Sequence, residues 1–202
     1  MLFRSADVRI GARYERRADA GLSHFLEHMV FQGCDGAPTA EAVNEAAECM
    51  GTALDAYTTR DMTHFEHQVS PEWAAEATAL LGRVLARPHF HDIEAERSII
   101  LEEALDEVDE KGRLIDAESL SRQALFPDSP LGSSVVGDMK NLERFDVGDL
   151  RRHHGRHYGG HNLVVAIAGP HGDDEMLDWL AAGFGDRSEE HTSELQSHSD
   201  LV

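Results

Sequence analysis

The segment that most constrains this chain is His24-Phe25-Leu26-Glu27-His28. Residues three and four apart share one face of an α-helix, so both imidazoles and the carboxylate point to the same side. Two imidazoles in this register can bind a single metal ion, and the carboxylate then lies beside that ion. The spacing therefore predicts a metal-binding helix.

The flanking residues indicate that this helix is largely buried. Six apolar residues surround the polar face: Leu22, Phe25, Leu26, Met29, Val30 and Phe31. Burying two histidines and a glutamate without partners costs free energy, and a bound metal removes that cost. The order His-x-x-Glu-His is the inverted form of a zinc-enzyme signature. On the five residues alone, a solvated helical face with two incidental histidines is an equal alternative.

Length, charge and cysteine content narrow the class of protein. The 202 residues suffice for one domain with a sizeable core, and no apolar run reaches the length of a membrane span. A net charge of -20 argues against nucleic acid as a partner. Cys34 and Cys49 do not make a disulfide framework, which favours a reducing compartment such as the cytoplasm. Periplasmic or organellar locations stay open, because the native N-terminus is expected to be missing.

Both ends of the chain are expected to be foreign. Residues 2–5 and 187–198 resemble the translation of the two arms of a common sequencing-library adapter. We therefore expect a genuine domain over residues 6–186, truncated at both ends, with residues 1–5 and 187–202 non-native.

The pattern of elements predicts an α+β fold, with helices packed on one side of a mainly antiparallel sheet. Strands are expected over residues 8–14, 53–60, 63–69 and 162–168. Helices are expected after Gly21, after caps at Thr39, Ser70, Asp92 and Asp146, over 113–126, and over 173–184. The helix after Ser70 is expected to bury Trp73.

The helix that begins at Asp92 carries many acids, most of which must form a solvated face. Glu96 and Glu103 lie two helical turns apart and share a side. Spacing alone does not distinguish Glu102 from Glu103 as a candidate metal ligand.

Four ordered blocks of this sequence resemble the pitrilysin/insulinase family of zinc metallopeptidases, which includes the mitochondrial processing peptidases. The blocks are Gly21–Gly33, Ala56–Thr63, Glu96–Glu103, and Ser129–Gly132 followed by Gly137. The resemblance covers nearly all of residues 8–184 and implies the N-terminal catalytic domain of that family.

The resemblance implies one zinc ion held by His24, His28 and, from the later helix, Glu103. It implies that Glu27 is the general base, which takes a proton from a zinc-activated water and passes it to the leaving amine. It also implies a supporting acid that matches Glu96. We assign Glu96 the orientation of a ligand, with a solvated helical acid as the alternative.

The resemblance further implies that the strand with Asp55, Ala56, Tyr57 and Thr58 receives peptide substrate as an added strand. The family usually has asparagine at the position of Asp55, which puts one side-chain contact in doubt but not the strand pairing. A second metal site in the cluster His153–His161 is disfavoured, because no acid or cysteine lies nearby in sequence.

These features predict a zinc-dependent metalloendopeptidase that acts on peptides or unfolded segments and needs a second homologous half, fused or separate. The alternative is a catalytically inactive homologue that serves as a structural or recognition subunit of a two-part peptidase. Completeness of the set favours the enzyme: His24, Glu27, His28, Glu96 and Glu103. A zinc lyase is disfavoured by the edge-strand and Pro130-Leu131-Gly132 blocks.

Overall fold

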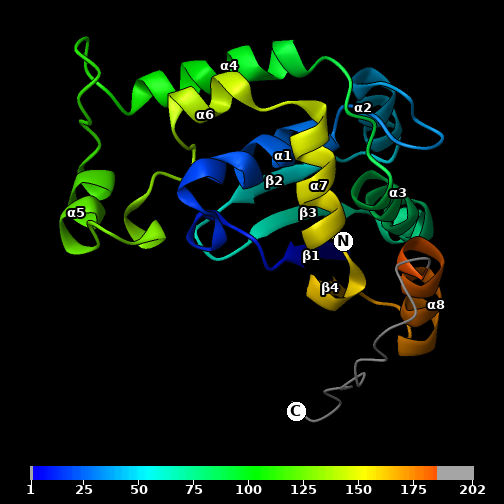
Figure 1. The fold of residues 1–202 in the computed structure, drawn as a ribbon. Helices are drawn as coiled ribbons and strands as arrows, with labels where there is room; N and C mark the ends of the chain where they lie inside the picture. Colours follow the sequence, from blue (N-terminus) through cyan, green and yellow to red (C-terminus); the bar gives the residue numbers. More distant parts are fainter. Residues whose placement is uncertain (1, 186–202) are drawn as a thin grey trace.

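A four-stranded antiparallel sheet forms the centre of the computed structural model, which describes residues 2–185 (Figure 1). The strands are β1 (Leu2–Val8), β2 (Asp55–Thr58), β3 (Thr63–Val69) and β4 (Leu163–Ala168), in the spatial order β2-β3-β1-β4. β1 pairs with both β3 and β4, whereas β2 pairs with β3 and forms one edge of the sheet. The predicted α+β class is confirmed.

The helices lie mainly on one side of this sheet, and α1 packs between the sheet and α4 (Figure 1). Their bounds are α1 (Leu22–Val30), α2 (Ala40–Cys49), α3 (Ala74–Ala86), α4 (Ile93–Asp106), α5 (Ala117–Leu125), α6 (Met139–Arg144), α7 (Val147–His157) and α8 (Asp173–Phe184). Short 3-10 turns cover residues 12–14, 17–19, 71–73, 130–132 and 160–162. None of the described helices is long and apolar enough to cross a bilayer.

The core forms where α1 packs on the inner face of the sheet. Phe25 and Met29 of α1 are fully buried, as are Val8 of β1 and Phe65 of β3. These residues recur at helical spacing in α1 and at alternate positions in the strands, so each element presents one apolar face to the other. Packing in this core therefore sets the distance between α1 and the sheet.

A close approach of two backbone segments sets the start of α1. Gly21 has φ 95°, a region that favours glycine, and a Cβ added there would lie 2.6 Å from the carbonyl oxygen of Val136. Gly137 has φ 108° and would meet the Cα atom of Gly21 at 2.4 Å. Only glycines at both positions let these segments touch and hold the first turn of α1.

Several sequence predictions of elements are confirmed, and the first predicted strand is wrong. The cap Thr39, the hairpin of β2 and β3, and the last helix over 173–184 are all present. The predicted strand over 8–14 is wrong, because β1 ends at Val8 and a 3-10 turn follows. The Ala12 amide donates to Thr59 and the Arg13 amide to Arg60, so this backbone crosses the β2–β3 turn instead of extending β1.

Trp73 was expected to be buried in the third helix, and this prediction is also wrong. Trp73 ends the 3-10 turn Pro71–Trp73 that precedes α3, and its side chain is 39% exposed. The inward positions of this helix belong instead to later residues: Ala77, Leu80, Leu81, Val84 and Leu85.

Residues 2–5, expected to be foreign, form the first half of β1 and pair with β3. Their origin stays a prediction, as does the domain boundary at residues 6–186. The expected foreign tail over 187–202 lies outside the described residues.

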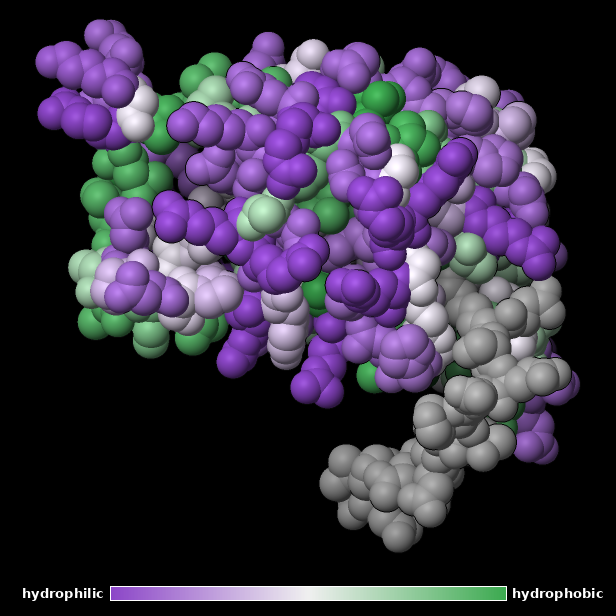
Figure 2. Space-filling model, in the orientation of Figure 1, coloured by the Kyte–Doolittle hydropathy of each residue, from purple (hydrophilic) through white to green (hydrophobic). Residues whose placement is uncertain are grey.

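Figure 2 shows a face that is mainly hydrophilic, in keeping with the net charge of -20. Apolar side chains gather at the side of this face where α5 lies. Exposed apolar residues of α5 and its flanks are Ile115, Leu120, Leu125 and Phe126.

Candidate metal centre

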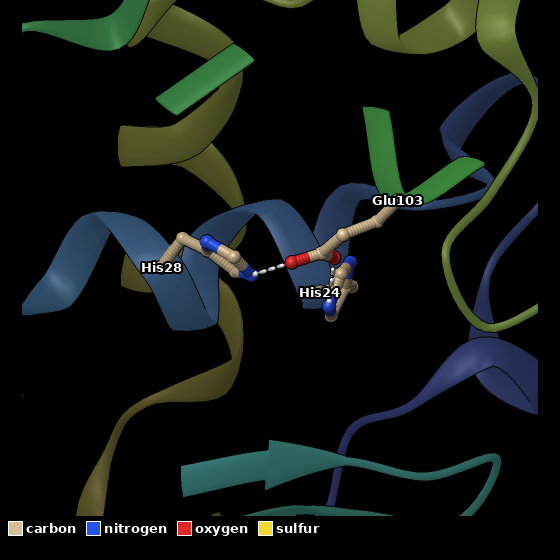
Figure 3. Close-up of side chains that lie close together, drawn as sticks. All are labelled: His24, His28 and Glu103. Carbon is tan, nitrogen blue, oxygen red and sulfur yellow. Dashed lines mark ion pairs between the residues drawn. The ribbon is translucent and has the colours of Figure 1, made fainter. Parts of the chain in front are cut away.

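The carboxylate of Glu103 lies between the imidazoles of His24 and His28 (Figure 3). One carboxylate oxygen is 3.5 Å from Nε2 of His24, and the other is 3.8 Å from Nε2 of His28. The two histidines project from α1, and Glu103 reaches them from α4. One potential ligand atom of each residue lies within 4.8 Å of the others.

His24 is held in its neutral form. Burial, with a smaller contribution from the nearby His28, lowers the pKa of His24 to about 4. At neutral pH its contact with Glu103 is therefore not an ion pair, despite the short distance. A neutral imidazole offers a ring nitrogen lone pair to a metal ion, which a protonated one cannot do.

A second acid of α4, Glu96, orients His28 by contacting its Nδ1 atom. That atom lies 3.1 Å from a carboxylate oxygen of Glu96. The other oxygen of Glu96 accepts a hydrogen bond of 2.7 Å from the side-chain amide of Gln32. Because an ionised carboxylate only accepts, Nδ1 of His28 donates to Glu96, and Nε2 is the ring nitrogen that faces Glu103.

Glu27 lies on the same face of α1 and contacts the edge strand. One of its carboxylate oxygens, Oε2, accepts a hydrogen bond of 2.5 Å from the hydroxyl of Thr58 in β2. Burial raises the pKa of Glu27, and the charge of Glu103 raises it too, whereas the Thr58 hydrogen bond and His28 lower it. The carboxyl group is thus partly desolvated and still hydrogen-bonded.

A buried glutamate secures the N-terminal end of α1. The Glu15 carboxylate accepts from the backbone amides of Gly21 and Ser23 at 2.8 Å and 2.6 Å. Negative charge is favourable at this end of a helix, where amides lack helical partners. The Ser23 hydroxyl lies 3.1 Å from Nε2 of His153 in α7, which ties α1 to that helix.

An arginine secures the ligand-bearing helix α4. The Arg97 guanidinium donates to the backbone carbonyl of Leu142, and at 2.7 Å to that of Phe145. It also lies 5.5 Å from the ring centroid of Phe25 in α1. One side chain thus links α4 to α1 and to the segment that ends α6.

The structure brings together most of the residues predicted for the site. His24, His28 and Glu103 lie close together. Glu96 contacts Nδ1 of His28, and Glu27 lies on the same helix as the two histidines. Glu102, the alternative to Glu103, is exposed and belongs to no convergent group of potential ligands in the described part of the chain.

The edge-strand residues divide into two groups. Thr58 reaches Glu27, whereas Asp55 is exposed and accepts a hydrogen bond from the Ala56 amide. Tyr57 stacks on His64, with ring centroids 4.7 Å apart, on the other side of the sheet. Among residues 2–185, the cluster His153–His161 supplies no convergent group of three potential ligands.

Sequence reasoning missed three of these contacts: Gln32 with Glu96, Arg97 with two carbonyls, and Glu15 with the start of α1. The one available signal was position, since Arg97 directly follows Glu96 and Gln32 lies one turn after His28. The partners of Gln32 and Arg97 are 45 to 64 positions away, so no local pattern identifies them, whereas Glu15 lies six and eight residues before its partners Gly21 and Ser23.

The donor set fits a zinc ion. Two imidazole nitrogens and one carboxylate oxygen are a known ligand set for catalytic zinc. Donor atoms bound at about 2.0–2.2 Å in tetrahedral geometry lie roughly 3.4 Å apart. Each imidazole is near that separation from a different oxygen of Glu103, at 3.5 Å for His24 and 3.8 Å for His28.

Comparison with known proteins gives the same family as the sequence motifs. Residues 5–139 match the family model described as insulinase (peptidase family M16). An uncharacterized zinc protease of Rickettsia bellii is 29% identical over 84% of this chain and 41% of its own length. A probable mitochondrial-processing peptidase subunit beta of Arabidopsis thaliana is 31% identical over 92% of this chain and 35% of its own length.

Solved structures share the fold. The first half of the periplasmic protease PqqL from Escherichia coli is 22% identical, with a TM-score of 0.82, over 97% of this chain and 43% of that one. This chain spans about two fifths or less of the length of the Rickettsia bellii and Arabidopsis thaliana relatives. Because the family model covers two thirds of the sequence, this chain belongs to the insulinase family, peptidase family M16.

Proposed function

We propose that this chain is the catalytic domain of a zinc-dependent metalloendopeptidase that cleaves peptides or unfolded segments. Membership of a peptidase family supports a hydrolytic function. The observation that carries the proposal is the convergence of His24, His28 and Glu103, with Glu27 on the same face of α1.

In this proposal, Nε2 of His24, Nε2 of His28 and the Glu103 carboxylate are the zinc ligands. Two observations support this assignment: Nε2 of both rings faces the Glu103 carboxylate, and the lowered pKa of His24 leaves that imidazole neutral. We assign Glu96 the role of orienting His28 through Nδ1, as carboxylates commonly do behind metal-bound histidines.

When bound, a zinc ion supplies Lewis-acid chemistry, which acidifies a water and polarises the peptide carbonyl. Glu27 accepts one proton from the water that attacks the carbonyl carbon. It then delivers that proton to the amine nitrogen as the carbon–nitrogen bond breaks. The raised pKa of Glu27 supports this role, since a base with a pKa closer to the working pH transfers protons in both directions.

The substrate in this proposal binds as an added strand along β2. β2 pairs with β3 on one side, and its other side is an edge of the four-stranded sheet. Main-chain hydrogen bonds to such an edge need an extended peptide, so the proposed substrates are short peptides or unfolded segments. Asp55, in place of the usual asparagine, would alter one side-chain contact.

We also propose that the active enzyme contains a second homologous half. The chain covers 43% of the first half of PqqL and 22% of the whole PqqL chain, so these proteins contain further domains. Alone, the 202-residue chain is expected to bind zinc but to cleave slowly.

Metal analysis of matched variants tests the ligand assignment. Glu103→Ala should lose zinc, whereas Glu102→Ala, one position away and exposed, should keep it at about one ion per chain. Loss of zinc in Glu102→Ala with retention in Glu103→Ala would contradict the assignment.

Hydrolysis of a quenched peptide tests catalysis. The wild type should cleave slowly, and Glu27→Gln should abolish cleavage while zinc stays bound. A wild type that binds zinc but does not cleave even with a homologous second half added would favour the alternative of an inactive subunit.

A further inference from the structure

The shortest contact between the proposed base and the proposed substrate strand is a hydroxyl hydrogen bond. Thr58 is the last residue of β2, and its hydroxyl lies 2.5 Å from Oε2 of Glu27. This contact joins α1, which carries the proposed ligands, to the edge of the sheet.

The hydrogen atoms around this hydroxyl can be assigned. The Thr63 hydroxyl donates to the carbonyl of Ile10 at 3.0 Å, so its one hydrogen is used there. Two acceptors lie near the Thr58 hydroxyl: Oε2 of Glu27 at 2.5 Å and the Thr63 oxygen at 3.4 Å. The Glu27 carboxylate is nearer and charged, so it accepts the stronger hydrogen bond.

We propose that Thr58 is a positioning residue that fixes Oε2 of Glu27 and thereby leaves Oε1 as the oxygen that moves the proton. This inference rests on the proposed function, because it assumes that Glu27 is the base. With one oxygen tied to β2, the carboxylate cannot rotate about its terminal bond without breaking the shortest contact it makes.

The hairpin makes Thr58 a rigid support. Thr58 and Thr63 are directly opposite each other in the antiparallel pairing of β2 and β3. Thr63 is fully buried and bonded to the chain that leaves β1. A peptide paired with the outer side of β2 would then be held by the same strand that holds the base, so the scissile bond and Glu27 keep a constant spacing.

A purely structural role for Thr58 predicts a different outcome. If the hydroxyl only stabilised the hairpin, its loss would loosen β2 and raise KM for a peptide that pairs with β2. Loss of a group that positions the base instead lowers kcat with little change in KM, because the defect lies in the transition state.

Three variants separate these roles. Thr58→Val removes the hydroxyl and keeps the branched shape, and Thr58→Ser keeps the hydroxyl. Thr52→Val is the matched control, since the Thr52 hydroxyl donates only to the Ala53 carbonyl just before β2. Each variant of the 202-residue chain is measured for zinc content and for kcat and KM on a quenched peptide. Crystal structures of wild type, Thr58→Val and Thr58→Ser give the orientation of Glu27.

Thr58→Val should lower kcat by about 10–100-fold, as removal of supporting hydrogen bonds commonly does, with KM and zinc content unchanged. Thr58→Ser should restore most of kcat, and Glu27 should leave its wild-type position in Thr58→Val alone. An unchanged kcat and Glu27 position in Thr58→Val, or a rise in KM alone, would overturn the inference. Failure of the wild type to bind zinc or cleave contradicts the proposed function instead, and the Glu27 orientations still decide the role of Thr58.

Discussion

The carboxylate of Glu96 lies 3.1 Å from Nδ1 of His28, on the side of the ring away from Glu103. Gln32 donates to the other oxygen of Glu96 at 2.7 Å and so limits its rotation. The contact determines which ring nitrogen of His28 carries the hydrogen. Glu96 is therefore the residue whose removal should alter the candidate metal centre without removing a donor atom.

Glu96→Ala should weaken zinc binding by about 10–100-fold, because the imidazole loses its fixed tautomer and orientation. Competition with a chromophoric chelator measures this change. Glu102→Ala, an exposed acid on the same helix, is the control and should bind zinc as the wild type does. Equal zinc affinities for Glu96→Ala and Glu102→Ala would show that Glu96 is a solvated helical acid with no role in orienting His28.

Arg97→Ala should lower the free energy of unfolding by about 2–3 kcal/mol, because two backbone carbonyls lose a charged donor. The Arg97 side chain is only 11% exposed, so water replaces its hydrogen bonds poorly. Urea unfolding followed by circular dichroism measures the change.

Arg122→Ala is the control for Arg97. Arg122 pairs with Glu118 at 2.8 Å on the exposed surface of α5, where such a pair contributes about 0–1 kcal/mol. A loss for Arg97→Ala no larger than that for Arg122→Ala would mean that α4 is held by its apolar contacts alone.

The fold was predictable where a local pattern and the tertiary contacts agree. The Thr39 cap, the β2–β3 hairpin and the helix over 173–184 follow from neighbouring residues, and all three are present. The strand over 8–14 failed because alternation reports burial and not pairing. Val8 and Ile10 are buried on alternate positions, yet the backbone after Val8 bonds to the β2–β3 turn. α6 was missed because six residues with the single buried Leu142 give no periodicity.

The sequence predicted some residues of the candidate site but not the contacts between distant segments. His24, Glu27 and His28 share a helical face by spacing alone. Selecting Glu103 over Glu102 needed the family resemblance, because two adjacent acids on one helix look alike in sequence. The contact of Glu27 with Thr58 spans 31 positions and joins a helix to a strand, so only the folded chain reveals it.

The stability of the metal-free chain should fall as the pH drops below about 6.5. Burial, with smaller contributions from neighbouring cationic groups, lowers the pKa of His153 from an ordinary value of 6.5 to about 3. The unfolded chain therefore binds the proton first, and this loss of stability develops from pH 6.5 toward pH 3. Between pH 6.5 and 5 the loss from His153 should be about 1–2 kcal/mol, measured by urea unfolding with a chelator present.

His153→Asn should reduce the slope of stability against pH over that interval. His161→Asn is the control, because His161 is exposed on the segment that follows the same helix. The same slope in wild type and His153→Asn would contradict a neutral, buried His153.

Replacing a buried cation in β1 should stabilise the protein. Arg4 is fully buried, and no carboxylate among the described residues pairs with it; its partners are the Thr78 hydroxyl, the Ala74 carbonyl and Nε2 of His67. Burial lowers the pKa of Arg4 to about 10.

The double variant Arg4→Met with His67→Leu should raise the free energy of unfolding by about 1 kcal/mol or more, since apolar side chains of similar volume are often more stabilising than a buried charge. Thr78 keeps its own bond to the Ala74 carbonyl, so no acceptor is orphaned. Arg9→Met, at the exposed residue just after β1, should change stability by less than about 0.5 kcal/mol. A destabilised double variant would show instead that the Arg4 hydrogen bonds outweigh its desolvation.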